Sequence, residues 1–248
     1  MTPGNYLRAL ASSAPSESQQ GLLAGADFMD AETADADVDV KQKGSGFSPV
    51  LGLSIKPNDR FNLGIKYEFN TKLELENETK VDGTGRFPDG EKIRSDLPAL
   101  LSVGVAFKAT DRLNLAGGVH YFFDKAADYG RIEPNEELID NNFLEFAFGI
   151  EYNVTPELLL SVGYLRTQTG VNEKYQNDLN YSLNTNTVGL GGSYAISQNL
   201  DLNLGFLYTM YEDDGIFIDY PGIGSVKESY ARNNMVIAIG LDIKFPVR

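Results

Sequence analysis

The chain has 248 residues, a formal net charge of −14 and no cysteine. The acidic balance argues against nucleic-acid binding, which depends on Lys and Arg, and the lack of cysteine excludes disulfides and thiolate metal sites. Hydrophobic residues make up 42% of the chain, too many for a disordered protein. No stretch approaches the ~18 consecutive apolar residues of a membrane-spanning helix.

The first 35 residues predict two short amphipathic helices on either side of Pro15. Their sequences are NYLRALASSA and SQQGLLAGADFM, with apolar residues at helical spacing. A loop decoration without a role of its own fits the same pattern. The start also lacks the basic and apolar regions of a signal peptide, so the chain is either cytosolic or lacks its true beginning. We expect residues 1–35 to form one helical segment and residues 36–245 to form β structure.

After the helices, the segment DADVDVKQKGSG leads into the first strand. Its apolar positions Val38 and Val40 are even-numbered, whereas those from Phe47 onward are odd-numbered. A shift of one position within a strand is typical of a β-bulge. We therefore expect a bulge near Gly44–Gly46.

From Phe47 to Phe245 the apolar residues alternate with small or polar ones. In LSVGVAFKATDRLNLAGGVHYFF (101–123), two alternating runs flank a polar turn, which is the pattern of a β-hairpin. One face of each run is large and apolar, and the other is small and weakly polar, with many of the 25 glycines. The pattern predicts nine strands of roughly 9 to 20 residues, whose clearest alternation lies at 47–55, 61–69, 101–107, 113–123, 144–152, 158–165, 187–196, 200–211 and 235–245.

Three features favour an antiparallel transmembrane β-barrel. The strands suit the ~9–11 tilted residues that cross a bilayer. Tight turns near 58, 110, 155 and 198 alternate with long polar loops at 76–97, 125–141, 169–182 and 213–231, as in outer-membrane barrels. Aromatic residues at the ends of the apolar runs predict interfacial girdles. The large apolar face would then meet lipid and the small face would line the lumen, while the alternative, a soluble lipid-binding barrel, would place the apolar face inside.

Nine is an odd number of strands, whereas single-chain bacterial barrels have an even number. With both termini expected on the same side of the membrane, we expect several further strands upstream of Met1.

In order and spacing, these motifs resemble the C-terminal part of the FadL-type long-chain fatty acid transporters. The resemblance is carried by ALASSAPSESQQGLLAGA, by VKQKGSGFSPVLGLSIKPNDRFNLGIKYEFNTKLELEN, by DLPALLSVGVAFKATDRLNLAGGVHYFFDK and by the ending GLDIKF. It implies an outer-membrane location in a Gram-negative bacterium, with nine of fourteen strands present and the N-terminal hatch absent. It also implies passive uptake of fatty acids or other hydrophobic compounds, and insertion through a C-terminal strand that ends at Phe245. Whether Pro246, Val247 and Arg248 belong to the native ending is left open.

The resemblance also suggests ligand-binding residues. In this family, hydrophobic ligands enter an apolar groove between the third and fourth extracellular loops, which residues 1–35 and 76–97 resemble. The groove candidates are Leu7, Leu10, Leu22, Leu23, Phe28 and Phe87. Lys66 takes the place of an inward basic residue that helps hold the ligand carboxylate. Alternatively, Lys66 pairs with an acid of the lumen, such as Glu68 or Glu145.

Nothing in the sequence indicates an enzyme, a metal or a cofactor. The single histidine, His120, falls on the inward face and fits a hydrogen-bonded filler better than a catalyst. The acidic stretch YEDDGIFID (211–219) lacks the spacing of an EF-hand, and no glycine-rich phosphate loop is present. The leading function is an outer-membrane channel for hydrophobic compounds, and a general porin or structural barrel is the alternative.

Overall fold

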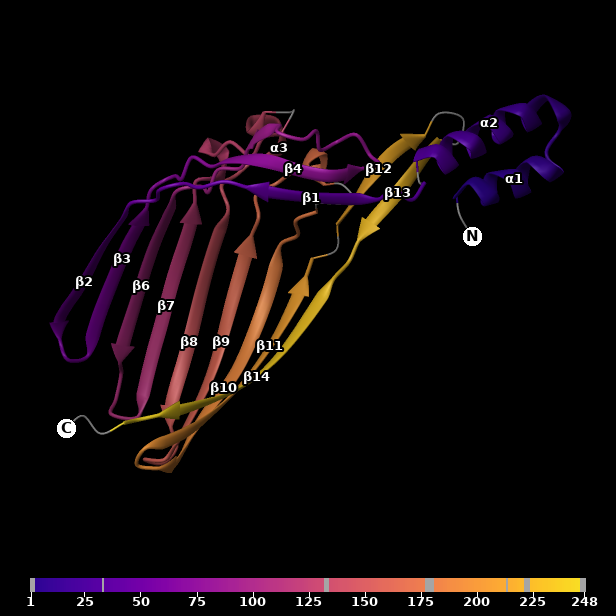
Figure 1. Ribbon diagram of the computed structural model, residues 1–248. Helices are drawn as coiled ribbons and strands as arrows, with labels where there is room; N and C mark the ends of the chain where they lie inside the picture. Colours follow the sequence, from indigo (N-terminus) through magenta and orange to yellow (C-terminus); the bar gives the residue numbers. More distant parts are fainter. Residues whose placement is uncertain are drawn as a thin grey trace. The chain divides into compact units, whose positions relative to one another are not determined.

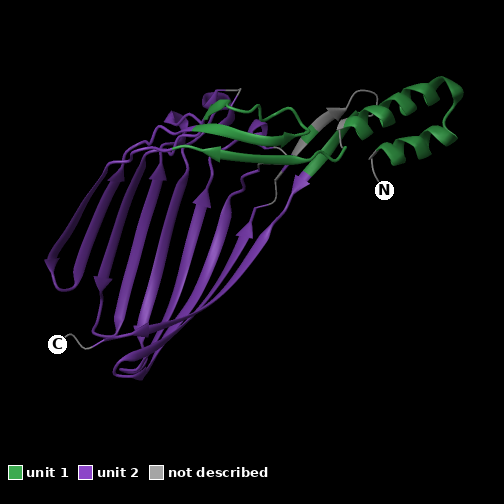
Figure 2. Cartoon of the chain, in the orientation of Figure 1, with its two compact units in different colours: residues 1–44, 75–93, 216–228 green, residues 45–74, 94–215, 229–248 purple. Residues whose placement is uncertain are grey.

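A computed structural model describes residues 3–32, 34–131, 134–176, 181–212, 214–220 and 224–245. The chain divides into two compact units: residues 1–44, 75–93 and 216–228 form the first, and residues 45–74, 94–215 and 229–248 form the second (Figure 2). Pro246, Val247 and Arg248 lie outside the described residues.

The second unit is built on one antiparallel sheet of nine strands, in the order β14-β11-β10-β9-β8-β7-β6-β3-β2 (Figure 1). This confirms the nine predicted strands, although their lengths run from 8 to 13 residues. The strands are β2 (Val50–Asn58), β3 (Phe61–Glu68), β6 (Leu100–Lys108), β7 (Leu113–Phe122), β8 (Leu144–Asn153), β9 (Leu158–Gln168), β10 (Thr185–Ser197), β11 (Leu200–Tyr211) and β14 (Asn233–Ile243). In the described structure the sheet is open, with β2 and β14 as its outer strands.

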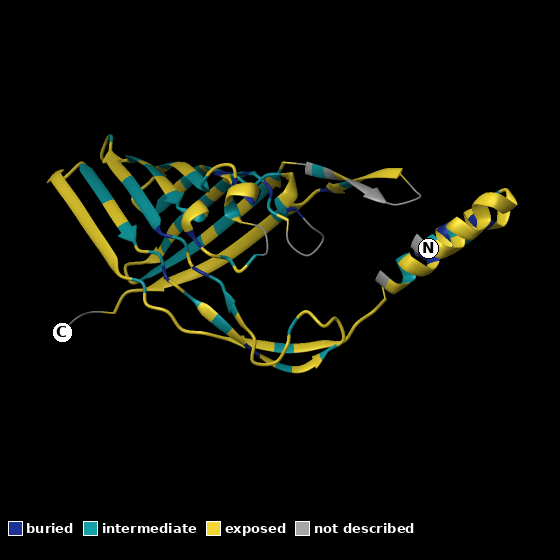
Figure 3. Cartoon of the chain, turned by 90° about the horizontal axis from the view of Figure 1, so that it is seen from above, coloured by how far each residue is buried: buried dark blue, intermediate teal, exposed yellow. Residues whose placement is uncertain are grey.

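The register gives the sheet two chemically different faces. Leu115, Ile150 and Val162 pair across β7, β8 and β9 on one face, and Ala116, Gly149 and Gly163 pair on the other. Large apolar side chains on the first face are open: Ile239 of β14 is 74% exposed. Most of each strand is exposed or half-buried (Figure 3). Because a water-soluble sheet buries its large side chains, this pattern supports a lipid-facing exterior.

The buried residues of the second unit lie largely in the loops rather than on the sheet. They include Ala99, Ala127, Leu138 and Ile139, each at most 7% exposed. The loops carry three short helices: η1 (Asp124–Ala126), α3 (Asn135–Leu138) and η2 (Glu173–Tyr175).

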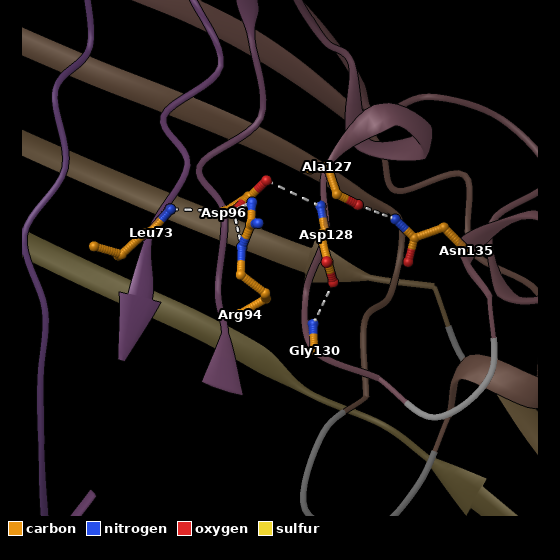
Figure 4. Close-up of polar contacts among 7 residues, drawn as sticks. All are labelled: Leu73, Arg94, Asp96, Ala127, Asp128, Gly130 and Asn135. Carbon is orange, nitrogen blue, oxygen red and sulfur yellow. Dashed lines mark hydrogen bonds and ion pairs between the residues drawn. The ribbon is translucent and has the colours of Figure 1, made fainter. Parts of the chain in front are cut away.

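One carboxylate, Asp96, organises part of this loop layer (Figure 4). Its side chain is only 4% exposed and pairs with Arg94. The backbone N–H groups of Leu73 and Asp128 donate to its two oxygens, over 3.1 and 3.4 Å. Burial acts to raise the pKa of Asp96, but the hydrogen bonds from Arg94 and the two N–H groups outweigh it and lower the pKa below its usual range.

The first unit contains the helices α1 (Pro3–Ser13) and α2 (Ser16–Glu32), which confirms the two predicted helices. Leu7, Ala11 and Ala26 are buried, at 4%, 1% and 0% exposure. Arg8 of α1 pairs with Asp27 and Asp30 of α2. The two helices therefore hold each other as a hairpin. Among the described residues, no helix has the length and hydropathy to cross a membrane.

One expectation about the connecting segments is wrong. The expected bulge near Gly44–Gly46 is a break between two strands: β1 (Val38–Lys43) ends before it and pairs with β4 (Glu74–Asp82). A register shift occurs instead between Asp39 and Val40, within the pairing of β1 with β4.

Two of the expected long loops contain strands of their own. Segment 76–97 holds most of β4 and all of β5 (Lys92–Arg94), which join β1 in a three-stranded sheet. Segment 213–231 holds β12 (Asp214–Tyr220) and β13 (Gly224–Tyr230), which pair with each other.

Candidate ligand site

A polar row crosses the small-residue face of the sheet near its loop end. The register places Lys66 of β3 opposite Ser102, and Ser102 opposite His120. The row continues through Glu145 of β8 to Thr167 of β9. Five neighbouring strands thus supply polar side chains at one level of a face that is otherwise mostly Gly and Ala.

Ion pairs and hydrogen bonds connect most of this row. Lys66 pairs with Glu68, which is one of the two acids expected as its partner. His120 Nδ1 lies 3.4 Å from Glu145 Oε2, and Thr167 Oγ1 donates to Glu145 Oε1 over 3.0 Å. Ser102 Oγ is buried without a hydrogen-bond partner in the described structure. The Lys66 side chain is 48% exposed, so solvent screens its pair with Glu68.

Lys66, Ser102 and His120 line a cavity of about 530 Å³. Its remaining walls are largely backbone, because Gly52, Gly64, Gly104 and Gly118 contribute no side chains. With Lys66 and His120 as its charged or titratable groups and the rest small or apolar, the cavity suits a ligand that is mainly apolar with one polar end.

A larger cavity of about 1110 Å³ lies farther toward the short turns. Small residues of four neighbouring strands contribute to its lining: Ala116 of β7, Gly149 of β8, Gly163 of β9 and Gly189 of β10. In both cavities, glycine or alanine at inward positions leaves space that larger side chains would fill.

The hairpin places the groove candidates of the first unit in different environments. Leu7 is buried against α2, where a Cβ at Gly25 would lie 3.6 Å from Leu7 Cδ1. Leu10, Leu23 and Phe28 are 40%, 43% and 58% exposed, and Leu22 is half-buried. Leu7 thus contributes to the hairpin core, while the exposed side chains stay available for contact.

Phe87 lies outside the hairpin, between β4 and β5. Its N–H donates to Asp82 Oδ2 over 2.7 Å, and its carbonyl accepts from Thr79 Oγ1 over 2.6 Å. The hydrogen bond from the Thr84 hydroxyl, together with those from backbone N–H groups that include Phe87, lowers the pKa of Asp82. The backbone around Phe87 is therefore fixed, and its ring is half-buried.

The sequence interpretation missed a polar patch on the outer face of β9, β10 and β11. Arg166 pairs with Glu212, and Asn186 Oδ1 accepts a hydrogen bond of 2.6 Å from the Tyr164 hydroxyl. Nearer the short turns, the same face of these strands carries apolar residues. Extending the alternation past Leu165 would have placed Arg166 outside.

Within the described ranges, no group of three or more His, Asp or Glu side chains is arranged to hold a metal ion. The acidic stretch 211–219 includes Asp213, which lies outside the described residues.

Comparisons with solved structures identify the fold. The chain matches a FadL homologue from Pseudomonas aeruginosa with a TM-score of 0.57 and 16% identity, over 77% of this chain and 50% of that one. It matches the toluene transporter TodX of P. putida with a TM-score of 0.52 and 18% identity, over 87% and 52%. It also matches the monoaromatic hydrocarbon channel CymD with a TM-score of 0.50 and 15% identity, over 92% and 63%. The predicted antiparallel barrel fold is thereby confirmed, and the chain spans between half and two thirds of the length of these proteins.

No curated protein sequence matches the chain at a significant level. A family model described as "Outer membrane protein transport protein (OMPP1/FadL/TodX)" matches residues 7–245. This family consists of outer-membrane transport channels rather than enzymes, which confirms the predicted outer-membrane location and excludes the soluble lipid-binding barrel. The chain belongs to the OMPP1/FadL/TodX family of outer-membrane transport proteins.

Proposed function

We propose that this protein forms a channel through which long-chain fatty acids or other hydrophobic compounds diffuse passively across the outer membrane. The observation that carries the proposal is the pair of cavities, about 530 and 1110 Å³, on the small-residue face of the sheet. Small and apolar residues make up most of both linings, while the charged residues of the larger cavity gather toward its short-turn end, at Lys56, Asp59, Arg60, Lys108 and Glu151. A porin for hydrophilic solutes remains the alternative function.

The proposed route begins at the outer loops. Exposed apolar side chains of the helical hairpin, and separately Phe87, are proposed to hold a ligand from the aqueous phase by burying its apolar area; the hairpin side chains are called the capture surface. The candidates are Leu7, Leu10, Leu22, Leu23, Phe28 and Phe87, of which Leu10, Leu23 and Phe28 are the most exposed. In the hairpin core, Leu7 supports this surface rather than contacting the ligand.

Lys66 is proposed to hold the polar end of an acidic ligand within the smaller cavity. Because Lys66 already pairs with Glu68, a ligand carboxylate competes with the Glu68 carboxylate for the same ammonium group. Lys66 then favours fatty acids over neutral hydrocarbons by a modest factor. The solved relatives include a toluene transporter and a monoaromatic hydrocarbon channel. Such neutral ligands need no cation, so neutral aromatic compounds are the second candidate ligands.

Two variants test this role, because they are expected to change the affinity for a fatty acid in opposite directions. Lys66→Gln removes the cation, whereas Glu68→Gln removes the competing carboxylate. An ion pair of this exposure contributes ~1 kcal/mol, which corresponds to about a fivefold change in affinity. We expect Lys66→Gln to weaken, and Glu68→Gln to strengthen, binding of a long-chain fatty acid. Binding of the alcohol of the same chain length is expected to stay unchanged in both variants.

Transport itself is measured in proteoliposomes that contain the protein, as the initial rate of entry of a fatty acid and of toluene. Lys80→Gln is the matched control, because Lys80 is 79% exposed and pairs with Asp39 outside the cavity. Entry rates equal to those of protein-free liposomes for both compounds would disprove the channel. Equal effects of Lys66→Gln on acid and alcohol would disprove only the role of Lys66.

Two partners follow from the same proposal. The large apolar face contacts membrane lipid, and β14, with the 80% exposed Phe245 just after it, is the segment that the outer-membrane assembly machinery would recognise. Replacing Phe245 by Ser is expected to lower the amount of protein inserted in the outer membrane, measured in membrane fractions.

A further inference from the structure

A third cavity, of about 460 Å³, lies at the loop end of strands β7 to β9, outside the ligand route. The polar side chains that line it are Tyr121, Asp140, Asn141, Asn142, Gln168 and Asn184. No lysine or arginine contributes to the lining. The cavity therefore offers amide, hydroxyl and carboxylate groups, and its one charged side chain is negative.

The register places this cavity on the lipid-facing side. Tyr121 pairs with Leu144, and Leu144 pairs with Gln168. Two residues farther along each strand, the same face carries Val119 of β7 and Phe146 of β8, both 41% exposed. The cavity thus begins where the apolar wall ends.

An aromatic cluster marks the same level of the wall. The rings of Tyr121 and Phe123 meet edge to face with centroids 5.0 Å apart, and Phe123 meets Tyr67 at 6.2 Å. Tyr and Trp gather where the bilayer changes from acyl chains to headgroups. We infer that the cavity lies at headgroup depth.

The two loops that form the cavity are fixed to each other. The Gly170 carbonyl accepts hydrogen bonds from the N–H groups of Asp140 and Asn141, over 2.9 and 3.0 Å. Asn172 Nδ2 donates to Asp140 Oδ1 over 3.0 Å, and Ile139 forms a β-bridge with Val171. A site held in this way loses little conformational entropy when a ligand binds.

Some polar side chains of the cavity already form hydrogen bonds within the protein, and others do not. Asn142 Nδ2 donates to the Tyr121 hydroxyl over 2.8 Å, and Asn142 Oδ1 accepts from the N–H of Lys125 over 3.0 Å. The side-chain amides of Asn141 and Gln168 make no hydrogen bond within the described structure, and both residues are exposed. Each amide supplies both a donor and an acceptor, which matches a sugar hydroxyl. A phosphate, in contrast, would meet the Asp140 carboxylate, and the ammonium group of the neighbouring Lys125 is already engaged by the Asp140 carbonyl, over 3.2 Å.

We propose that this cavity binds the sugar headgroup of an outer-leaflet glycolipid, whose acyl chains lie against the apolar wall below it. Sugar hydroxyls pair with the free amides of Asn141 and Gln168, and the chains contact Phe146 and its neighbours. The site recognises a component of the membrane and is separate from the cavities on the opposite face of the sheet.

The test is native mass spectrometry of the delipidated protein in detergent, titrated with lipopolysaccharide of short sugar chain. The double variant Asn141→Leu/Gln168→Leu is compared with the control Asn233→Leu, which changes an exposed outward amide of β14 that does not line the cavity. We expect one glycolipid per protein, at least tenfold weaker binding in the double variant and unchanged binding in the control. Phosphatidylglycerol and the released oligosaccharide are each expected to bind at least tenfold more weakly than the intact glycolipid.

Equal binding by wild type and double variant would overturn the site. Competition by phosphatidylglycerol at equal concentration would overturn the recognition of sugar, and full affinity for the released oligosaccharide would overturn the membrane source. Because all three side chains are exposed, loss of folding is not expected, and heat-modified mobility in gels checks it. Fatty-acid entry into proteoliposomes is expected to be the same in all variants, so the outcome is independent of the channel proposal.

Discussion

Replacing Asp96 by Ala is expected to loosen the loop layer of the second unit. The substitution leaves the N–H groups of Leu73 and Asp128 without their acceptor, at 3.1 and 3.4 Å in the intact protein. A lost hydrogen bond to a buried group costs ~1 kcal/mol, so the two together cost ~2 kcal/mol. The half-exposed Arg94 is left out of this sum, because its guanidinium group reaches solvent.

A cost of ~2 kcal/mol raises the opening constant of the layer about 30-fold. Amide hydrogen exchange of the detergent-solubilised protein measures this directly, at the N–H groups of Leu73, Asp128 and Gly130. Gly130 belongs to the same network, since its N–H donates to Asp128 Oδ1 over 3.0 Å. Exchange in the centres of β8 and β9 is expected to stay unchanged, because the sheet has its own hydrogen bonds.

The matched control is Asp111→Ala. Asp111 also pairs with a cation, Lys108, but its side chain is 89% exposed in a short turn, where an ion pair contributes ~0–1 kcal/mol. If Asp96→Ala changes exchange less than threefold, or no more than Asp111→Ala does, the argument that Asp96 organises the layer is refuted.

Three further predictions concern the same unit. Since the pKa of Asp96 is lowered, its contribution to stability is fully present above the ordinary Asp pKa of ~3.9 and is lost as the pH falls through the lower folded value. Relative to the intrinsic exchange rate at each pH, exchange of the layer should therefore accelerate in acid for the wild type and not for Asp96→Asn; an equal acceleration in both would contradict the assignment. Gly170→Ala combines a φ of +70° with a Cβ only 2.0 Å from the Asn141 carbonyl oxygen, so we expect ~3 kcal/mol of local destabilisation, seen as faster exchange at Asp140 and Asn141. Val162→Arg, on the lipid face, should lower the free energy of unfolding by ~2–4 kcal/mol, measured in a urea titration of the folded barrel. Gly163→Ser, on the inner face, should lower it much less. The reverse order would mean that the lipid-facing and lumen-facing sides are assigned the wrong way round.

Much of the sheet could be predicted because every second residue of a strand faces the same environment, so the residue types alternate with it. The turns between β2 and β3 and between β6 and β7 are short, so each hairpin is a local feature of the sequence. The two chemical faces followed from the same alternation. Segments without this two-residue alternation were harder to predict from the sequence.

The strands β1, β4 and β5 show the limit. Only a few apolar residues alternate in them, Val38 and Val40 in VDVKQK and Leu75 and Val81 in ELENETKVD, and polar residues share the same face. With so short an apolar alternation, the sequence of segment 76–97 predicts a polar loop.

The candidate site was predictable only in part. The position of Lys66 on the inner face followed from its place between Ile65 and Tyr67. Its partner did not, since Glu68 and Glu145 satisfied the pattern equally. In the structure Lys66 pairs with Glu68 of the same strand, whereas Glu145 lies on β8, beyond β6 and β7 in the sheet. The burial of Leu7 depends on the packing of α1 on α2, a tertiary contact that the helical pattern alone leaves open.

The glycines of the inner face have a consequence for how this protein can discriminate among ligands. Where Gly64, Gly104 and Gly118 meet in register, and again at Gly149, Gly163 and Gly189, the wall consists of main chain. Such a surface has no rotamers, so it keeps one shape whatever molecule passes. Selectivity, and its drift between related proteins, must then reside in the few side chains that border this smooth wall, and substitutions there can change the preferred compound without disturbing the barrel.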